Sequence, residues 1–166
     1  MTGNRLTDLL YLSIVPRWGI VDHIKPQTVG DHTFRVMVIY TELAHRLDFA
    51  QGISVDALMC ILHHDAAECR TGDVPTPAKK MFPGFDTVAE GAVPWYGGSL
   101  VLPNEAVLIT IADLIEATTF IRRYGIGPHS QRVETVLCSS IKKRCPADWQ
   151  NVVWAVMREI NEDAGR

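Results

Sequence analysis

Apolar positions recur along this chain with the period of an α-helix, and the strict alternation typical of strands is nearly absent. The first helical stretch covers residues 3–14, and we expect it to turn an apolar face inward. The apolar positions of that face are Leu6, Leu9, Leu10 and Ile14. Pro16 ends the element, because proline cannot continue a helix. The pattern predicts an all-α protein.

Residues 16–28 contain two prolines and a glycine, which predicts a loop. Thr28 is followed three residues later by Asp31, an arrangement that resembles a capping box with aspartate in the usual glutamate position. It predicts that a second helix runs over about 29–46.

Ser54 suits the N-cap of a third helix, which we expect to end near Arg70. The residues that break this helix are Gly72, Pro75 and Pro77. Residues 81–103 are the least regular stretch and fit one short helix within a long loop. Asn104 caps the next helix, which ends at Tyr124 before Gly125. Two further helices are predicted near 128–144 and 147–163.

Length and composition indicate one domain over residues 1–166, with the candidate chemistry in about 1–125 and C-terminal helices over about 126–164. The formal net charge of -3 argues against a general nucleic-acid partner. No apolar run approaches the length of a membrane span, and the polar start "MTGNRLTDLL" is not typical of a signal peptide. The four cysteines form no C-x-x-C pair, and Cys60 and Cys138 fit buried thiols. We therefore expect a cytoplasmic protein.

Histidines and carboxylates gather in "LHHDAAE" at residues 62–68, and two residues elsewhere supply matching ligands. His32 lies in the predicted second helix, and Asp113 interrupts the apolar stripe of "LITIADLIEA", where an isolated carboxylate is costly. Adjacent helical residues point about 100° apart, so His64 and Asp65 reach one ion only at a buried helix junction. Two imidazoles and two carboxylates suit a divalent ion such as Mn, Co, Ni, Fe, Zn or Mg.

Glu68 lies four residues after His64 and three after Asp65, so a continuous helix would place all three on one face. It is not needed as a ligand, and we expect it to transfer protons beside the ion. A His-His-Asp run alone is more often a solvated helix face or a satisfied core. Asp113 is the residue that favours metal binding, whereas we expect His63 to face another way.

The order His32, His64-Asp65, Asp113 resembles the H…HD…D signature of the HD-domain metal-dependent phosphohydrolases. The likeness extends to "RWGI" at 17–20, "KPQTVGDHTFRV" at 25–36 and "TGDVPTPAK" at 71–79. These motifs resemble the bacterial HD-domain 5'-deoxynucleotidases (YfbR-like) and, more closely, the short phage dATP triphosphohydrolases (DatZ-like). The resemblance covers roughly residues 1–125. It implies a single helical HD-domain bundle with a metal site between helices.

The resemblance also implies a role for each matching residue. The implied metal ligands are His32, His64, Asp65 and Asp113. Arg17 and Lys79 would hold phosphate, and Trp18 would pack against the sugar and leave no room for a 2'-hydroxyl. Ile20 and Pro77 would line the base pocket. The structural alternative is that the two cations are solvated loop charges and that Trp18 and Ile20 fill the core beneath the loop.

The implied reaction is hydrolysis of the bond between the α-phosphorus and the 5'-oxygen of a deoxynucleotide, with Glu68 as the catalytic carboxylate. A divalent ion (Co, Mn, Zn, Ni or Mg) is the implied cofactor, with a second Mg on the substrate phosphates as an option. The "RWGI" match favours dATP, cleaved to deoxyadenosine and triphosphate, in a phage whose genome uses 2-aminoadenine. The alternatives are a 5'-deoxynucleotidase that acts on dNMP, and a catalytically inert nucleotide sensor.

Two departures from the family pattern bear on these expectations. Asp31 stands where a glutamate commonly precedes the first histidine. The segment between Lys80 and Asp113 is shorter than in the 5'-deoxynucleotidases, which favours the phage type. We expect a small-molecule partner, no nucleic acid or membrane, and a homo-oligomer, because the C-terminal helices carry surplus apolar surface. A phage-encoded protein would work in the host cytoplasm.

Overall fold

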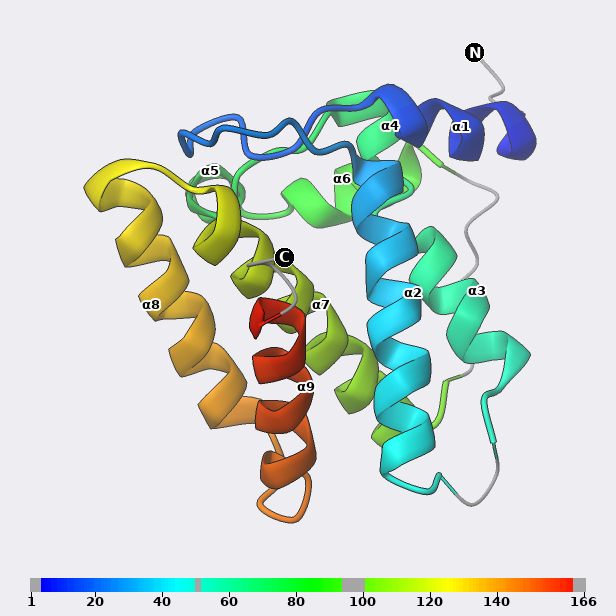
Figure 1. The fold of residues 1–166 in the computed structure, drawn as a ribbon. Coiled ribbons are helices and arrows are strands. Elements are labelled where there is room, and N and C mark those ends of the chain that lie inside the picture. The colour runs from blue at the N-terminus through cyan, green and yellow to red at the C-terminus, as the bar shows by residue number, and fades with distance from the viewer. Residues whose placement is uncertain (1–3, 50–51, 94–100, 163–166) are drawn as a thin grey trace.

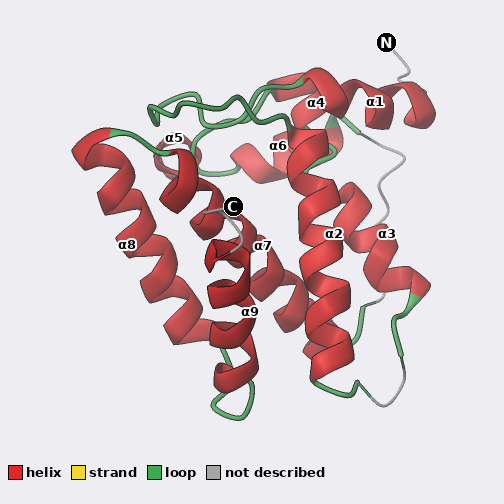
Figure 2. Cartoon of the chain, in the orientation of Figure 1, coloured by secondary structure: helices red, strands yellow, loops and turns green. Residues whose placement is uncertain are grey.

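A computed structural model describes residues 4–49, 52–93 and 101–162 (Figure 1). Its helices are α1 (Arg5–Tyr11), η1 (Leu12–Ile14), α2 (Val29–Arg46), α3 (Val55–His63), α4 (Glu68–Thr71), α5 (Thr76–Met81), α6 (Phe85–Gly91), α7 (Pro103–Tyr124), α8 (Gly127–Arg144) and α9 (Gln150–Glu162). Within the described ranges no residue belongs to a strand, and only isolated bridges join Pro16 to Thr28 and His23 to Gly125 (Figure 2). The predicted all-α class is confirmed.

Helix α7 is the centre of the bundle, and it packs against α2 and α3 on one side and against α8 and α9 on the other (Figure 1). One continuous apolar core joins these helices. Its fully buried members are Val36, Tyr40, Leu43, Ala57, Ile61, Leu108, Ile111, Ala112, Ile115, Ile141 and Val153. The short elements and the loop of residues 16–28 lie together across one end of this bundle (Figure 1). That end holds the candidate chemistry.

The second helix runs over Val29–Arg46, as its capping signal predicted. Thr28 Oγ1 accepts a hydrogen bond from the Asp31 backbone N–H at 3.1 Å, and Asp31 Oδ2 accepts one from the Thr28 N–H at 3.2 Å. Asp31 therefore completes the reciprocal cap although it departs from the glutamate of the family pattern. The cap fixes where α2 begins, and with it the position of His32 in the first turn.

The inner face predicted for the first helix is wrong. Leu6 and Leu10 are each 65% exposed and Ile14 is 63% exposed, while Leu9 is only half-buried. Asp8 turns inward instead, and Arg70 donates a hydrogen bond to its carboxylate. The helix is short and ends in the turn of η1, so it packs through an ion pair and Leu12 and leaves its leucines outside.

The prediction of one helix from Ser54 to Arg70 is also wrong, because α3 ends at His63. Residues 64–67 form a turn, and Glu68 opens the short helix α4. Gly72 follows with φ +71°, a left-handed conformation that suits glycine. The break places His64 and Asp65 at a junction between helices, and it removes the shared helical face on which Glu68 was expected.

The later helices follow the sequence pattern closely. The single short helix that was expected within residues 81–103 is α6. Residues 94–100 of the same stretch lie outside the described ranges. The sequence did not predict α5. Helix α7 begins at Pro103 rather than after Asn104, because the Glu105 carboxylate accepts the N–H of Leu102 at 3.2 Å. Gly125 ends α7, where an added Cβ would lie 2.6 Å from the Ile121 carbonyl oxygen.

Two further expectations concern the thiols and the membrane. Cys60 and Cys138 are half-buried rather than buried, and Cys145 is the buried thiol. Among the described helices, none is long and apolar enough to span a membrane. The division at about residue 125 stays a prediction, as does the single domain.

Candidate active site

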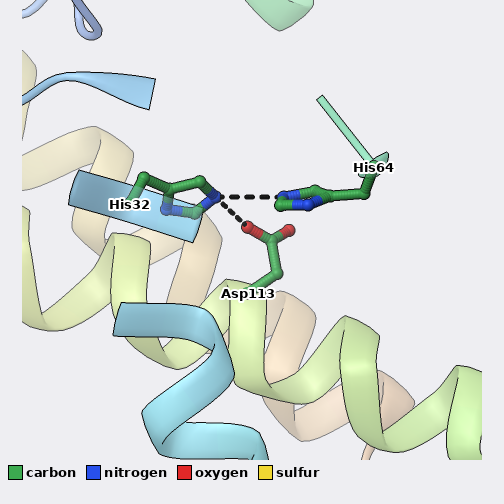
Figure 3. A group of neighbouring side chains, drawn as sticks. All are labelled: His32, His64 and Asp113. Carbon is green, nitrogen blue, oxygen red and sulfur yellow. Dashed lines mark hydrogen bonds and ion pairs between the residues drawn. The ribbon is translucent and has the colours of Figure 1, made fainter. Parts of the chain in front are cut away.

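Three elements bring His32, His64 and Asp113 together at one point (Figure 3). His32 lies in α2, His64 follows the last residue of α3, and Asp113 lies in the middle of α7. His32 Nε2 is 3.3 Å from His64 Nε2 and 3.1 Å from Asp113 Oδ1. One ligand atom from each residue lies within 4.8 Å of the others, a spacing that could hold a metal ion.

The hydrogen bonds on the far side of each ring decide which nitrogen carries the proton. His64 Nδ1 lies 2.6 Å from the Ile61 carbonyl oxygen, which only accepts, so this nitrogen donates. His32 Nδ1 lies 2.6 Å from Glu116 Oε2, and it donates to that carboxylate. Both Nε2 atoms of the neutral rings therefore point lone pairs at each other and at Asp113. A cation at this point would satisfy all three groups, so the residues fit a metal ion.

Asp65 stands beside this group rather than inside its tightest part. Its Oδ2 atom is 3.3 Å from His64 Nε2 and 3.7 Å from His32 Nε2. The junction after α3 turns the side chains of His64 and Asp65 to the same side, as a shared ion requires. Two imidazoles and two carboxylates therefore converge as the sequence pattern suggested.

Asp113 is more open than its apolar stripe suggested, since 38% of its side chain is exposed. Burial raises the pKa of Asp113, but its hydrogen bond with His32 and the charge of His32 outweigh this and lower the pKa to about 2. For His32, burial and the charge of Arg17 lower the pKa, whereas its bonds to Asp113 and Glu116 raise it to about 9.

Glu116 contacts the candidate ligand His32, and the sequence pattern did not single it out. It is 1% exposed, and its carboxylate accepts from His32 Nδ1 at 2.6 Å and from Gln27 Nε2 at 2.7 Å. Arg17 Nη1 and Arg35 Nη1 each lie 3.6 Å from it. Glu116 follows Asp113 by three residues in α7, so the i, i+3 spacing of two carboxylates on an apolar helix was the available signal.

Trp18 has a strained backbone, with φ +67°, a region that non-glycine residues seldom adopt. Its N–H donates to Asp73 Oδ2 at 2.9 Å, and its indole Nε1–H donates to Gln27 Oε1 at 2.7 Å. The ring stacks parallel to Phe120 with 5.9 Å between the centroids. The loop from residue 16 thus holds the indole in one orientation at the end of α7.

Glu68 is buried at the start of α4, with 6% of the residue exposed. Lys79 Nζ in α5 donates to its Oε1 at 3.3 Å, while Oε2 has no hydrogen-bond partner among the described residues. Burial and the negative charges of Asp65 and Asp73 raise the pKa of Glu68 to about 8, against the opposing charges of Lys79 and Arg17. A carboxyl group that titrates near neutrality is suited to general acid or base catalysis.

Arg17 is the cation best placed for an anionic ligand. Its side chain is 14% exposed, and its guanidinium lies over the Trp18 ring at 5.2 Å from the centroid. In the part of the chain that the structure describes, its buried Nε and Nη1 atoms have no hydrogen-bond partner. Nη1 is paired with the Glu116 carboxylate only at 3.6 Å, too long for a hydrogen bond. Buried N–H donors without hydrogen-bond acceptors are costly, so these two atoms favour a bound anion.

The remaining candidates lie less close to the centre. Lys79 reaches Glu68, whereas Ile20 is 52% exposed in the loop and Pro77 is exposed in α5. Their role in a base pocket stays a prediction. Of the other cations near the motifs, Arg70 is paired with Asp8.

Histidines and aspartates that converge in a helical bundle from α2, the turn after α3 and α7 define a phosphohydrolase of the HD class. Comparison with known proteins agrees. The sequence model of the 5'-deoxynucleotidase YfbR-like family matches residues 6–90. The chain belongs to this family of YfbR-like HD phosphohydrolases.

Phage and bacterial relatives were found. The dATP triphosphohydrolase of Cyanophage S-2L is 30% identical over 140 residues, which cover 81% of this chain and 79% of that protein. The dATP triphosphohydrolase of Acinetobacter phage SH-Ab 15497 is 26% identical over 155 residues, covering 81% and 76%. The 5'-deoxynucleotidase YfbR of Escherichia coli K12 is 31% identical over 71 residues, covering 41% and 36%.

The fold matches solved structures over nearly its whole length. The Cyanophage S-2L HD phosphohydrolase DatZ, bound to dA and one catalytic Zn²⁺ ion, superposes with a TM-score of 0.80 at 25% identity, covering 98% of this chain and 99% of that one. A protein of Pyrococcus horikoshii superposes with a TM-score of 0.70 at 21% identity, covering 95% and 97%, and supports the fold alone.

Proposed function

We propose that this protein is a metal-dependent deoxynucleoside triphosphate triphosphohydrolase that cleaves dATP to deoxyadenosine and triphosphate. The convergence of His32, His64 and Asp113, with both Nε2 lone pairs aimed at one point, carries the proposal. The two phage relatives that span most of the chain support the substrate. Such an enzyme would deplete dATP, which suits a phage genome that uses 2-aminoadenine.

The ion would be held by His32, His64, Asp65 and Asp113. Zinc is the first candidate, because the DatZ structure holds a catalytic Zn²⁺ and the two imidazoles suit it, while Co, Mn, Ni or Mg fit the same donors. When bound, a divalent ion neutralises phosphate charge and activates water for attack. A second Mg would bind the β- and γ-phosphates of the substrate.

The chain's own residues divide the remaining work. Water adds to the α-phosphorus and the bond to the 5'-oxygen breaks, so one proton must leave the water and one must reach the 5'-oxygen. Glu68 transfers protons in this exchange, because its free Oε2 and raised pKa let it both accept and donate near neutral pH. Arg17 and Lys79 bind the phosphates, and their charges stabilise the transition state.

Trp18 packs against the sugar in this proposal. Phe120 stacks against one face of the ring and Gln27 accepts from the indole N–H at its edge, so the ring is held in place and leaves no room for a 2'-hydroxyl. The base would be lined by Ile20, two residues further along the loop, and by Pro77 in α5. An apolar contact at this point would exclude a base that carries a 2-amino group. Adenine would then be favoured over guanine.

A 5'-deoxynucleotidase that acts on dNMP is the second candidate, because the YfbR-like family model matches residues 6–90. The two reactions cut the same bond, and they differ in whether β- and γ-phosphates are held. Arg35, whose side chain is 43% exposed and lies 3.6 Å from Glu116, is an additional cation for the longer substrate. An inert nucleotide sensor is disfavoured by Glu68, whose buried, partly unpaired carboxylate has no role in binding alone.

Phosphorus NMR of the Zn- or Co-loaded protein tests the proposal, with dATP, dAMP, dGTP and ATP as separate substrates. We expect inorganic triphosphate from dATP and little product from dGTP or ATP. Orthophosphate from dAMP, with dATP untouched, would replace the proposal with the 5'-deoxynucleotidase. Binding of dATP without turnover at any ion would indicate the sensor. We further propose that the protein is a homo-oligomer and works in the host cytoplasm. Analytical sedimentation of the purified protein would measure its subunit number.

A further inference from the structure

We infer that Gln27 and Glu116 form a polar relay that couples the ring of Trp18 to the imidazole of His32, and so links sugar selection to ion binding. The sugar end of this role rests on the proposed function, because Trp18 selects a sugar only if the substrate is a nucleotide. Gln27 and Glu116 would be positioning residues that touch neither the substrate nor the ion.

The relay consists of three consecutive hydrogen bonds. Trp18 Nε1–H donates to Gln27 Oε1 at 2.7 Å, and Gln27 Nε2–H donates to Glu116 Oε1 at 2.7 Å. His32 Nδ1–H donates to the other oxygen of Glu116 at 2.6 Å. Gln27 is 4% exposed, Glu116 is 1% exposed and His32 is fully buried. Water therefore offers these groups little alternative, and the bonds are strong determinants of orientation.

The donors and acceptors at the two ends of the relay, Trp18 and His32, allow only one assignment of its hydrogen bonds. An indole nitrogen can only donate, so Gln27 must present its oxygen to Trp18 and its NH₂ group to Glu116. An ionised carboxylate can only accept, so His32 must donate Nδ1–H to Glu116. This leaves the His32 Nε2 lone pair directed at the ion site. As long as residue 116 is a glutamate, the side chain at position 27 must therefore donate at one end and accept at the other.

Trp18 has a left-handed backbone conformation, and its indole edge is held by the bond to Gln27. Its main-chain N–H is held by Asp73, and Phe120 supports one face of the ring. Neither contact fixes the edge of the indole. The bond to Gln27 does so, and its loss would let the ring rotate and make room at the sugar.

Two isosteric exchanges test the relay. In Gln27→Glu, two carboxylates face each other and the Gln27–Glu116 bond is lost. In Glu116→Gln, the new amide cannot accept from both His32 and Gln27, so one of those bonds is lost. In the double exchange Gln27→Glu/Glu116→Gln, position 116 donates to position 27 and accepts from His32, while position 27 still accepts from Trp18. All three bonds return with unchanged volume and net charge.

Each variant is measured in two ways that do not require turnover. The first is the affinity for Co²⁺, followed by its visible absorption. The second is the ratio of deoxyadenosine to adenosine affinity in the Zn-loaded protein, by calorimetry. We expect Glu116→Gln to weaken Co²⁺ binding about 10–100-fold, and Gln27→Glu to lower the affinity ratio about tenfold. The double exchange should recover most of both losses. Gln131→Glu, on an exposed position of α8, is the matched control and should change neither.

Single variants that match the parent in both readouts would overturn the relay. A double variant no better than the weaker single variant would overturn it too, since the loss would then be one of packing or charge. Gln27→Met, which keeps the volume and removes both bonds, should lower the affinity ratio even if the charged variants fail to fold. A parent that does not distinguish deoxyadenosine from adenosine would contradict the proposed function, and the Co²⁺ series would then decide the relay by itself.

Discussion

His32 and His64 face each other with their Nε2 atoms 3.3 Å apart, and in the neutral rings neither of these nitrogens carries the proton. Two lone pairs at this distance repel unless a cation or a proton lies between them. Alanine at His32, His64 or Asp113 should therefore lower bound Zn²⁺ and abolish hydrolysis. His129→Ala, at an exposed position, is the control. Elemental analysis of purified variants checks this, and full metal content in His64→Ala would contradict it.

Glu68→Gln should separate ion binding from catalysis. The amide keeps the volume and can still accept from Lys79, but it cannot exchange a proton with the reacting groups. We expect unchanged metal content and a kcat lower by on the order of 10²-fold or more. Turnover equal to that of the parent would exclude Glu68 as the acid or base.

The metal-free protein should lose stability as the pH rises from about 4.5 to about 8. The folded state raises the pKa of Glu68 to about 8, so the folded protein binds a proton that the unfolded chain has already released. Between these values the unfolded state binds fewer protons, and the free energy of unfolding falls with pH. Urea unfolding of the parent and of Glu68→Gln, at matched pH values, measures the difference. A constant gap between the two proteins over this range would contradict the raised pKa.

Arg17→Met should weaken substrate binding more than it weakens the fold. The buried Nε atom has no hydrogen-bond partner in the described structure, and Nη1 has only the ion pair with Glu116 at 3.6 Å, so both can donate to a phosphate. Hydrogen bonds to charged groups contribute about 1.5–3 kcal/mol, which corresponds to a KM for dATP raised roughly 10–100-fold. Arg132→Met, exposed on α8, is the matched control. An unchanged KM would return Arg17 to the role of a structural loop cation.

Ile115→Ala and Leu10→Ala should differ sharply in their effect on stability. Ile115 is fully buried in the core, and its truncation should cost about 2–5 kcal/mol of unfolding free energy. Leu10 is 65% exposed, so its truncation should change stability by less than about 0.5 kcal/mol. Chemical denaturation checks both. A large cost for Leu10→Ala would indicate that a second copy covers this face.

The reciprocal cap at Thr28 and Asp31, the stop at Gly125 and the periodicity of the long helices are local signals. They predicted α2 and the ends of the C-terminal helices to within a few residues. The sequence also singled out the histidines and aspartates that lie together in the structure. Asp113 was its strongest signal, because a carboxylate in an apolar helix needs a partner wherever that helix packs.

Tertiary structure decided the features that depend on distant neighbours. The break after His63 allows His64 and Asp65 to face one ion, although the local pattern favoured a continuous helix to Arg70. The inward turn of Asp8 depends on Arg70, which is 62 residues away. The pairing of Gln27 with Glu116 spans 89 residues. Helical periodicity describes only which residues share a face of one element, whereas polar pairing across elements is fixed by how those elements pack together.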